Sequence, residues 1–175
     1  MMAGGSFFET APGSAGIYVI VENVRSLFNV GAIFRSADGV GASGVVLTGF
    51  TGKPPRHEIS RVALGAEESV PWTYYLRTSD AITDLRNKGV SVVALEATED
   101  SGSFREATFD FPVAFVVGHE VEGVMLETIA ACDFAVHIPM MGTKTSLNVS
   151  VAAGIALYGL LDASTRHKDL VDPNG

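Results

Sequence analysis

Gly16-Ile-Tyr-Val-Ile-Val21 is an uninterrupted apolar run that ends at the polar pair Glu22-Asn23, and it gives the clearest indication of the fold. Its β-branched and aromatic residues favour a strand, and its lack of polar positions favours a strand buried on both faces. A helical pattern follows over residues 29–38, with Asn29 as the expected N-cap. A doubly buried strand followed by an amphipathic helix is typical of a parallel sheet covered on both sides.

The same alternation of strand and helix patterns continues through the rest of the chain. Further strands are expected over residues 44–48, 72–76, 90–95, 113–117 and 134–138. Further helices are expected over residues 58–68, 80–88, 123–131 and 146–161. The sequence therefore predicts an α/β fold with a mostly parallel sheet and helices on both faces. Ligands of such sheets bind at the carboxyl ends of the strands, so the loops after Val21, Leu95, Val117 and Ile138 are the expected site.

The length of the chain, 175 residues, fits one compact domain. That domain is expected over residues 16–165, between a flexible N-terminal arm over 1–15 and a flexible tail over 166–175. The arm has no Lys or Arg and no long apolar stretch, and no apolar run in the chain is long enough for a membrane span. We therefore expect a cytoplasmic protein without a membrane partner.

The composition excludes several classes of protein. Hydrophobic residues make up 47% and charged residues 18%, which excludes a disordered chain. The net charge of −8 argues against a broad polyanion-binding surface, although it leaves room for a small basic site. The single cysteine, Cys132, excludes an internal disulfide and a zinc site built from cysteines.

Three patterns that could suggest other functions are weak. Gly39-Val-Gly41-Ala-Ser-Gly44 follows a helix and precedes a strand, the reverse of a dinucleotide fingerprint. Gly142-Thr-Lys144-Thr-Ser146 lacks the spacing of a P-loop. The four histidines have no metal-ligand spacing, and no metal is expected. His137 and His167 are interpreted as surface or core imidazoles, whereas His57 and His119 stand in loops that could line a site.

Three other segments are more specific. The first is Asn23-Val-Arg-Ser-Leu-Phe-Asn29-Val-Gly31-Ala-Ile-Phe-Arg35-Ser-Ala37, the second is Val117-Gly118-His-Glu120-Val-Glu-Gly123, and the third is Ile138-Pro139-Met140-Met-Gly142-Thr-Lys-Thr-Ser146-Leu147-Asn148-Val-Ser150. In this order, over about residues 16–161, they resemble the three motifs of the SpoU (TrmH) family of RNA ribose 2′-O-methyltransferases, within the SPOUT class.

This resemblance implies a C-terminal deep trefoil knot, which general rules of chain connection would not predict. The knot loops, here residues 95–98, 118–123 and 138–148, would hold S-adenosylmethionine. Relatives of this kind work as homodimers with the final helix at the interface. The implied substrate is RNA, with tRNA favoured, and DNA is not expected.

The resemblance implies five catalytic residues, Asn29, Arg35, Glu120, Ser146 and Asn148. Arg35 would project from the same helix as Asn29 toward the site. It would act either as the base or, more easily for a guanidinium that hardly deprotonates, by holding a phosphate and stabilising an alkoxide. Glu120 would order the site by anchoring Arg35 or a neighbouring loop. Ser146 and Asn148 would cap the last helix and bond the cofactor and the acceptor.

The resemblance also implies the residues that hold the ligands. The cofactor-binding residues would be Leu95, Glu96, Ala97, Gly118, Ile138, Met140, Ser146 and Leu147. Glycines at 118 and 142 would permit close approach of the backbone. The substrate-binding residues would be Arg25, Lys53, Arg56 and Lys144. Because these cations are few, RNA affinity is expected to be weak and to depend only shallowly on salt.

Two other hypotheses remain beside tRNA ribose methylation. One is a 2′-O-methyltransferase that acts on rRNA. The other, favoured by the acidic composition, is a non-catalytic α/β protein that binds a nucleotide.

Overall fold

The computed structural model describes residues 16–171, and it describes side chains as far as residue 166. A seven-stranded sheet has the order β3-β2-β1-β6-β4-β7-β5, and every neighbouring pair is parallel. Its strands are β1 (Ile17–Glu22), β2 (Gly44–Thr48), β3 (Trp72–Tyr75), β4 (Ser91–Leu95), β5 (Gly102–Ser103), β6 (Val113–Val117) and β7 (Phe134–His137). The predicted α/β class and parallel sheet are confirmed.

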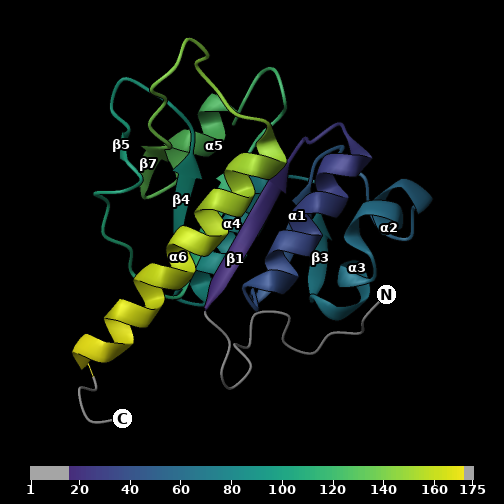
Figure 1. Ribbon diagram of the computed structural model, residues 1–175, viewed down its shortest axis with the longest axis horizontal. Helices are drawn as coiled ribbons and strands as arrows, with labels where there is room; N and C mark the ends of the chain where they lie inside the picture. The colour runs from purple at the N-terminus through teal and green to yellow at the C-terminus, as the bar shows by residue number, and fades with distance from the viewer. Residues whose placement is uncertain (1–15, 172–175) are drawn as a thin grey trace.

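Six helices within the described residues cover the two faces of the sheet (Figure 1). They are α1 (Leu27–Gly39), α2 (His57–Ala63), α3 (Ala66–Ser69), α4 (Thr78–Asn87), α5 (Leu126–Ala131) and α6 (Val149–Val171). Helices α1 and α6 pack side by side on one face, and α4 lies behind the sheet in Figure 1. No helix described between residues 16 and 171 has the length and apolarity that crossing a membrane requires.

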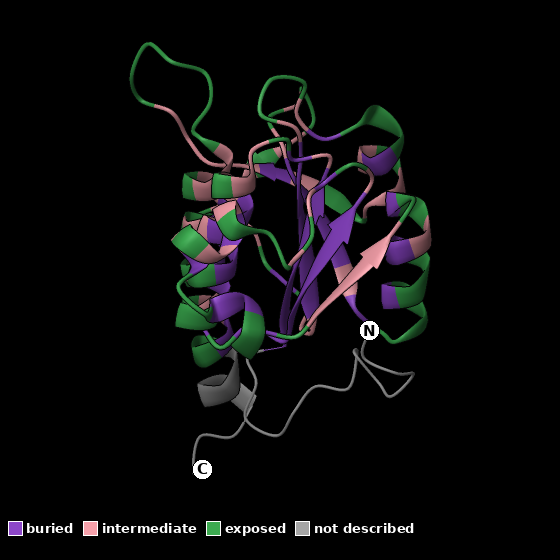
Figure 2. Ribbon diagram, turned by 90° about the vertical axis from the view of Figure 1, so that its right-hand side faces the viewer, coloured by how far each residue is buried: buried purple, intermediate pink, exposed green. Residues whose placement is uncertain are grey.

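Strand β1 shows how the sequence divides the core between these faces. Ile17, Val19 and Val21 join the cluster that contains the buried residues of α1 and α6. Tyr18 and Ile20 point the other way, into the cluster that contains those of α4. Since successive side chains of a strand alternate between faces, an unbroken apolar run is what a sheet buried on both sides needs. Figure 2 shows this buried sheet between helices whose outer surfaces are exposed.

The N-cap of helix α1 lies three residues earlier than predicted. The predicted N-cap, Asn29, is wrong, because Ser26 is the cap and its hydroxyl accepts the Asn29 N–H at 3.3 Å. Both residue types are good caps, and the polar Ser26 lies before two apolar residues that the helix includes. Because Asn29 does not cap the helix, its side-chain amide can form the hydrogen bonds of the site described below.

The predicted helix over residues 58–68 is two short helices, α2 and α3. Leu64 and Gly65 separate them with left-handed φ angles of 53° and 94°. Another missed element is β5, whose two residues pair with the end of β7. A two-residue edge strand has no apolar run that could reveal it.

The last helix differs from its prediction at both ends. It begins at Val149, so Ser146 lies outside it, and Asn148 caps it by accepting the N–H of Ser150 at 2.9 Å. It continues to Val171, beyond the apolar run that ends at Leu161. Residues 166–171 of the expected flexible tail are therefore helical, while residues 172–175 and the expected arm over 1–15 lie outside the described residues.

Candidate active site

A cavity of about 190 Å³ lies where the loops after β4, β6 and β7 meet the start of α6. These are three of the four loops that the sequence marked as the expected site. Strands β6, β4 and β7 are neighbours in the sheet, so their carboxyl ends bring the three loops together. The cavity is lined by Leu95, Glu96, Ala97, Val117, Gly118, His119, Glu120, Val121, Glu122, Gly123, His137, Ile138, Met140, Thr145, Ser146, Leu147, Val149 and Ala152.

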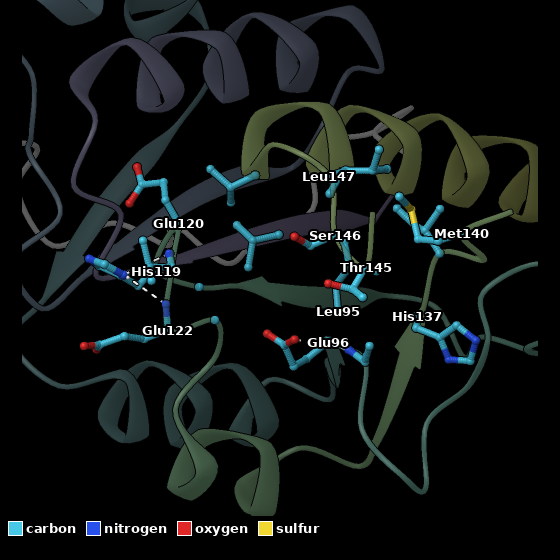
Figure 3. A pocket seen from close by; sticks show the side chains of 18 residues that line it. Leu95, Glu96, His119, Glu120, Glu122, His137, Met140, Thr145, Ser146 and Leu147 are labelled. Atoms are coloured by element: carbon cyan, nitrogen blue, oxygen red, sulfur yellow. Dashed lines mark hydrogen bonds between the residues drawn. The ribbon is translucent and has the colours of Figure 1, made fainter. Parts of the chain in front are cut away.

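All eight residues expected to hold the cofactor line this cavity. In Figure 3, Ser146 and Leu147 lie on one side of the cavity, at the start of α6, and Glu96 lies on the other side. The lining is apolar at Leu95, Ile138 and Leu147. It is acidic at Glu96, Glu120 and Glu122, and no Lys or Arg is among the described lining residues. This combination suits a ligand with an apolar ring system and a positive charge.

Glu120 connects the loop after β6 with the start of α1. Its Oε2 accepts the N–H of Arg25 at 2.9 Å, and its Oε1 accepts the N–H of Ser26 at 2.8 Å. The Asn29 side-chain amide donates to Oε1 at 3.0 Å. Partial burial alone would raise the pKa of Glu120, but these hydrogen bonds outweigh it and hold the pKa below its usual value.

Asn29 extends the same network to α6. Its Oδ1 accepts a hydrogen bond of 3.2 Å from the Asn148 side-chain amide. The Oδ1 of Asn148 in turn accepts the N–H and the hydroxyl of Ser150, at 2.9 and 2.6 Å. Three residues that the sequence predicted as catalytic thus form one hydrogen-bonded chain, which joins three elements far apart in sequence.

The loop of residues 118–123 is held against the end of β4. Glu96 Oε2 accepts the N–H of Val124 at 2.9 Å. A Cβ on Gly118 would collide with the backbone of Gly123, so only glycine allows this approach. A Cβ on Gly142 would meet no atom of the chain within 4 Å, so no contact within the chain itself requires a glycine there.

His119 has a structural role that its place in a loop did not reveal. Its Nδ1 accepts the N–H groups of Val121 at 3.1 Å and Glu122 at 3.2 Å (Figure 3). An imidazole nitrogen that accepts carries no proton, so the hydrogen of this ring lies on Nε2. His137 also lines the cavity, where its Nδ1 lies 2.9 Å from the hydroxyl of Ser101. The place of His137 in the lining was not predicted from sequence, and His57, which stands in a loop that could have lined a site, does not line this cavity.

Arg35 does not lie at the cavity of its own chain. Its side chain is exposed, does not line the cavity and makes no hydrogen bond or ion pair with another residue of 16–166. Glu120 therefore anchors the loop at Arg25 and not Arg35. Six positions along an α-helix turn a side chain well away from the starting direction, so Arg35 cannot share the direction of Asn29.

The four expected substrate-binding cations are exposed and lie outside the cavity lining. Arg25 joins the site through its backbone alone. The ammonium of Lys53 lies 3.9 Å from the centre of the Tyr74 ring. Arg56 contacts Glu58 at 3.9 Å, and Lys144 belongs to the exposed loop before α6.

Within the described residues, no group of three or more His, Cys, Asp or Glu side chains could hold a metal ion.

Comparison with known proteins agrees with this geometry. The model of the SpoU rRNA Methylase family matches residues 16–158, which include all three loops of the cavity. The chain belongs to this family. The resemblance that the three motifs predicted is thereby confirmed.

Relatives within the SpoU family differ in their named RNA. A 23S rRNA (guanosine-2′-O-)-methyltransferase, RlmB, from Ralstonia nicotianae is 34% identical over 142 residues, or 81% of this chain and 57% of its own length. The chain thus spans just over half the length of such curated relatives. A solved structure, that of the A. aeolicus TrmH/SpoU tRNA modifying enzyme, is 28% identical to this chain with a TM-score of 0.80, and the match covers 97% of this chain and 84% of that enzyme.

Another solved relative is named as a complex with a ligand. The AdoMet bound rRNA methyltransferase from Sinorhizobium meliloti is 32% identical, has a TM-score of 0.80 and covers 91% of this chain and 59% of its own. The sheet and helices of the SpoU fold are therefore shared across nearly the whole described chain.

Proposed function

We propose that this SpoU-family chain transfers a methyl group from S-adenosylmethionine to a ribose 2′-hydroxyl of RNA. The observation that carries the proposal is the cavity, because all eight residues implied as cofactor ligands line it. The hydrogen-bonded chain from Glu120 through Asn29 to Asn148 adds a second support, since it lies at the same loops. The relative named RlmB is a guanosine 2′-O-methyltransferase, and another is AdoMet bound.

The chemistry of the lining fits S-adenosylmethionine. The side chains of Leu95, Ile138 and Leu147 offer an apolar surface for a purine. Three carboxylates with no cation among the described lining residues favour a ligand that carries a sulfonium and an ammonium. When bound, S-adenosylmethionine supplies a methyl carbon on a positively charged sulfur and leaves as S-adenosylhomocysteine.

The residues of the chain would supply position and charge. Glu120 fixes the loop after β6 against α1 and so keeps Asn29 and Asn148 in place. Either amide can then hold the acceptor ribose. In the transfer, the bond between the methyl carbon and the sulfur would break as the ribose oxygen bonds to that carbon, and the hydroxyl proton would pass to water. Arg35 is suited to stabilise the negative oxygen that develops, because a guanidinium remains charged.

We propose that Arg35 does this in a homodimer, from the partner of the subunit whose cavity is used. Arg35 is exposed and stands outside the cavity of its own chain. Helix α1, which carries it, packs beside α6, where Gly154 lies against Ser36. Val151, Ile155 and Tyr158 form an exposed apolar stripe on α6, with exposed fractions of 50%, 42% and 53%. Burial of that stripe in a dimer would bring Arg35 of one subunit near the other.

The trefoil knot belongs to the same proposal. Its three implied loops, residues 95–98, 118–123 and 138–148, all contribute to the one cavity. A knot would keep these loops together before any ligand binds, and so reduce the entropy lost on binding.

The proposed RNA is a tRNA, acted on in the cytoplasm. The A. aeolicus relative named a tRNA modifying enzyme matches this chain over 84% of its own length. The second candidate is rRNA, favoured by the 34% identity to RlmB. Mapping of ribose methylation by mass spectrometry, in tRNA and rRNA from a strain without this chain, distinguishes the two.

Calorimetric titration with S-adenosylmethionine tests the proposal, with Gly118→Val and Gly142→Ala compared under the same conditions. The unchanged chain and Gly142→Ala should bind, whereas Gly118→Val should lose binding because its side chain collides with Gly123. Failure of the folded, unchanged chain to bind would overturn the proposal. Binding of the cofactor without transfer to any RNA would favour the non-catalytic nucleotide-binding alternative.

A further inference from the structure

Phe50 is a large aromatic side chain presented to solvent beside the candidate active site. It stands at the tip of the turn after β2, and 63% of its surface is exposed. We infer that its ring stacks on an unpaired base of the RNA substrate. This inference rests on the proposed function and specifies the form of RNA that the site accepts.

The turn that carries Phe50 is held rigidly from several sides. The N–H of Phe50 donates to Asn23 Oδ1 at 3.2 Å, and the hydroxyl of Tyr74 donates to the carbonyl of Gly49 at 2.7 Å. Gly49 has a φ of 63°, and a Cβ there would collide with the Asn23 side chain. A fixed backbone under an exposed ring is preorganised for binding, since little conformational entropy remains to be lost.

The same turn is joined to the active-site network. Thr51 is buried, and its hydroxyl donates to Val21 O at 2.9 Å and accepts the N–H of Val24 at 3.0 Å. The next residue, Arg25, donates its N–H to Glu120. The Phe50 ring also packs nearly perpendicular to that of His119, with ring centres 6.0 Å apart. A base on Phe50 would therefore belong to a nucleotide near the one whose ribose is methylated.

The charge beside Phe50 suits a nucleotide. The ammonium of Lys53 lies over the ring of Tyr74, whose hydroxyl binds the carbonyl next to Phe50. Arg25, whose N–H binds Glu120, and Arg56 are also exposed. An aromatic ring flanked by cations is how proteins bind single-stranded RNA, with stacking for the base and a cation for the phosphate. Paired bases are already stacked on each other, so the ring selects an unpaired nucleotide.

The test measures binding of RNA without cofactor, by fluorescence anisotropy. The probes are an RNA hairpin with a single-stranded loop and a blunt RNA duplex of the same length and composition. The variants are Phe50→Ala, Phe50→Trp and, as a control, Leu126→Ala, because Leu126 is also an exposed apolar side chain (83%). Calorimetry with S-adenosylmethionine checks that each variant keeps its fold and cavity.

The unchanged chain should prefer the hairpin, and Phe50→Ala should weaken hairpin binding about tenfold while duplex and cofactor binding stay unchanged. Phe50→Trp and Leu126→Ala should bind the hairpin as the unchanged chain does. The inference is overturned if Phe50→Ala binds the hairpin normally, if it weakens both RNAs equally, or if the unchanged chain shows no preference for the hairpin. A Phe50-dependent preference in a chain that binds no S-adenosylmethionine would overturn the proposed function and leave the stacking role standing.

Discussion

The side-chain amide of Asn29 donates a hydrogen bond of 3.0 Å to Glu120, a residue 91 positions away in the sequence. The same side chain accepts a hydrogen bond from Asn148, which lies at the start of α6. Because each partner stands on a different segment, the contact fixes helix α1, the loop after β6 and the start of α6 relative to one another. The cavity is thus assembled by the chain itself before any ligand arrives.

Replacement of Glu120 by glutamine should loosen this assembly. Both carboxylate oxygens accept backbone N–H groups, so an amide NH₂ in place of one oxygen puts two donors face to face. We expect Glu120→Gln to lower the free energy of unfolding by about 1 kcal/mol, a value at the low end because the residue is exposed. Denaturant unfolding measures this, with Glu122→Gln as a control that should change little. Equal stability of the two variants would contradict the role given to Glu120.

The free energy of unfolding should depend on pH through the ionisation of the Glu120 carboxylate. The folded pKa of Glu120 is lowered, so its ionised form stabilises the fold above the ordinary glutamate value of about 4.3, and this stability is lost as pH falls through the folded pKa. The difference in unfolding free energy between the unchanged chain and Glu120→Gln should therefore be largest near neutral pH and shrink below about pH 4.3. A difference that stays constant down to low pH would rule out this linkage.

Loss of the Arg35 guanidinium should separate binding from transfer. Arg35→Ala should keep S-adenosylmethionine affinity and lose at least about a hundredfold in methyl transfer. Arg61→Ala, an exposed arginine of α2, serves as the control and should keep both. Mixed dimers of Arg35→Ala and Asn148→Ala should recover activity if Arg35 serves the partner's cavity. If activity does not recover, Arg35 acts at the cavity of its own subunit.

A charge on the α6 stripe should separate the proposed dimer. Ile155→Asp places a carboxylate in the centre of the apolar surface formed with Val151 and Tyr158, where burial in an interface would be costly. Light scattering should give a dimer mass for the unchanged chain and a monomer mass for this variant. Leu126→Asp, on a different exposed surface, should remain dimeric. A dimeric Ile155→Asp would show that the interface lies elsewhere.

Cys132 should be unreactive in the folded chain. Burial raises the pKa of its thiol to about 12; the charge of Arg86 acts in the opposite direction, and the carboxylates of Asp133 and Glu22 act in the same direction as burial. Very little thiolate is then present at pH 8, and the thiolate is the reactive form. A disulfide reagent should label Cys132 much more slowly in the native chain than in denaturant. Equal rates would show that the thiol is accessible and ionised.

The sheet and the cavity loops could be predicted from sequence because their signals are local. The apolar run of β1 and the motif residues at 95–97, 118–120 and 138–148 mark strand ends directly. The fold then brings those ends together through the parallel order of β6, β4 and β7.

The remaining features depend on contacts between distant segments. Ser26 rather than Asn29 caps α1. The sequence alone could not distinguish the two, because the acceptor of the hydrogen bond from the Asn29 amide is Glu120, a residue far away in the chain. The direction of Arg35 follows from where α1 begins and how it packs. The exposure of Phe50 likewise depends on anchors at Asn23 and Tyr74, which no local pattern joins to it.

The most direct test of the central claim is methyl transfer in vitro from labelled S-adenosylmethionine to RNA taken from a strain without this chain. The RNA is then digested and its nucleosides are separated. Label is expected in a 2′-O-methylated nucleoside, with none when the enzyme carries Glu120→Gln together with Arg35→Ala. Label on a base instead of a ribose, or no label with an enzyme that binds the cofactor, would contradict this claim.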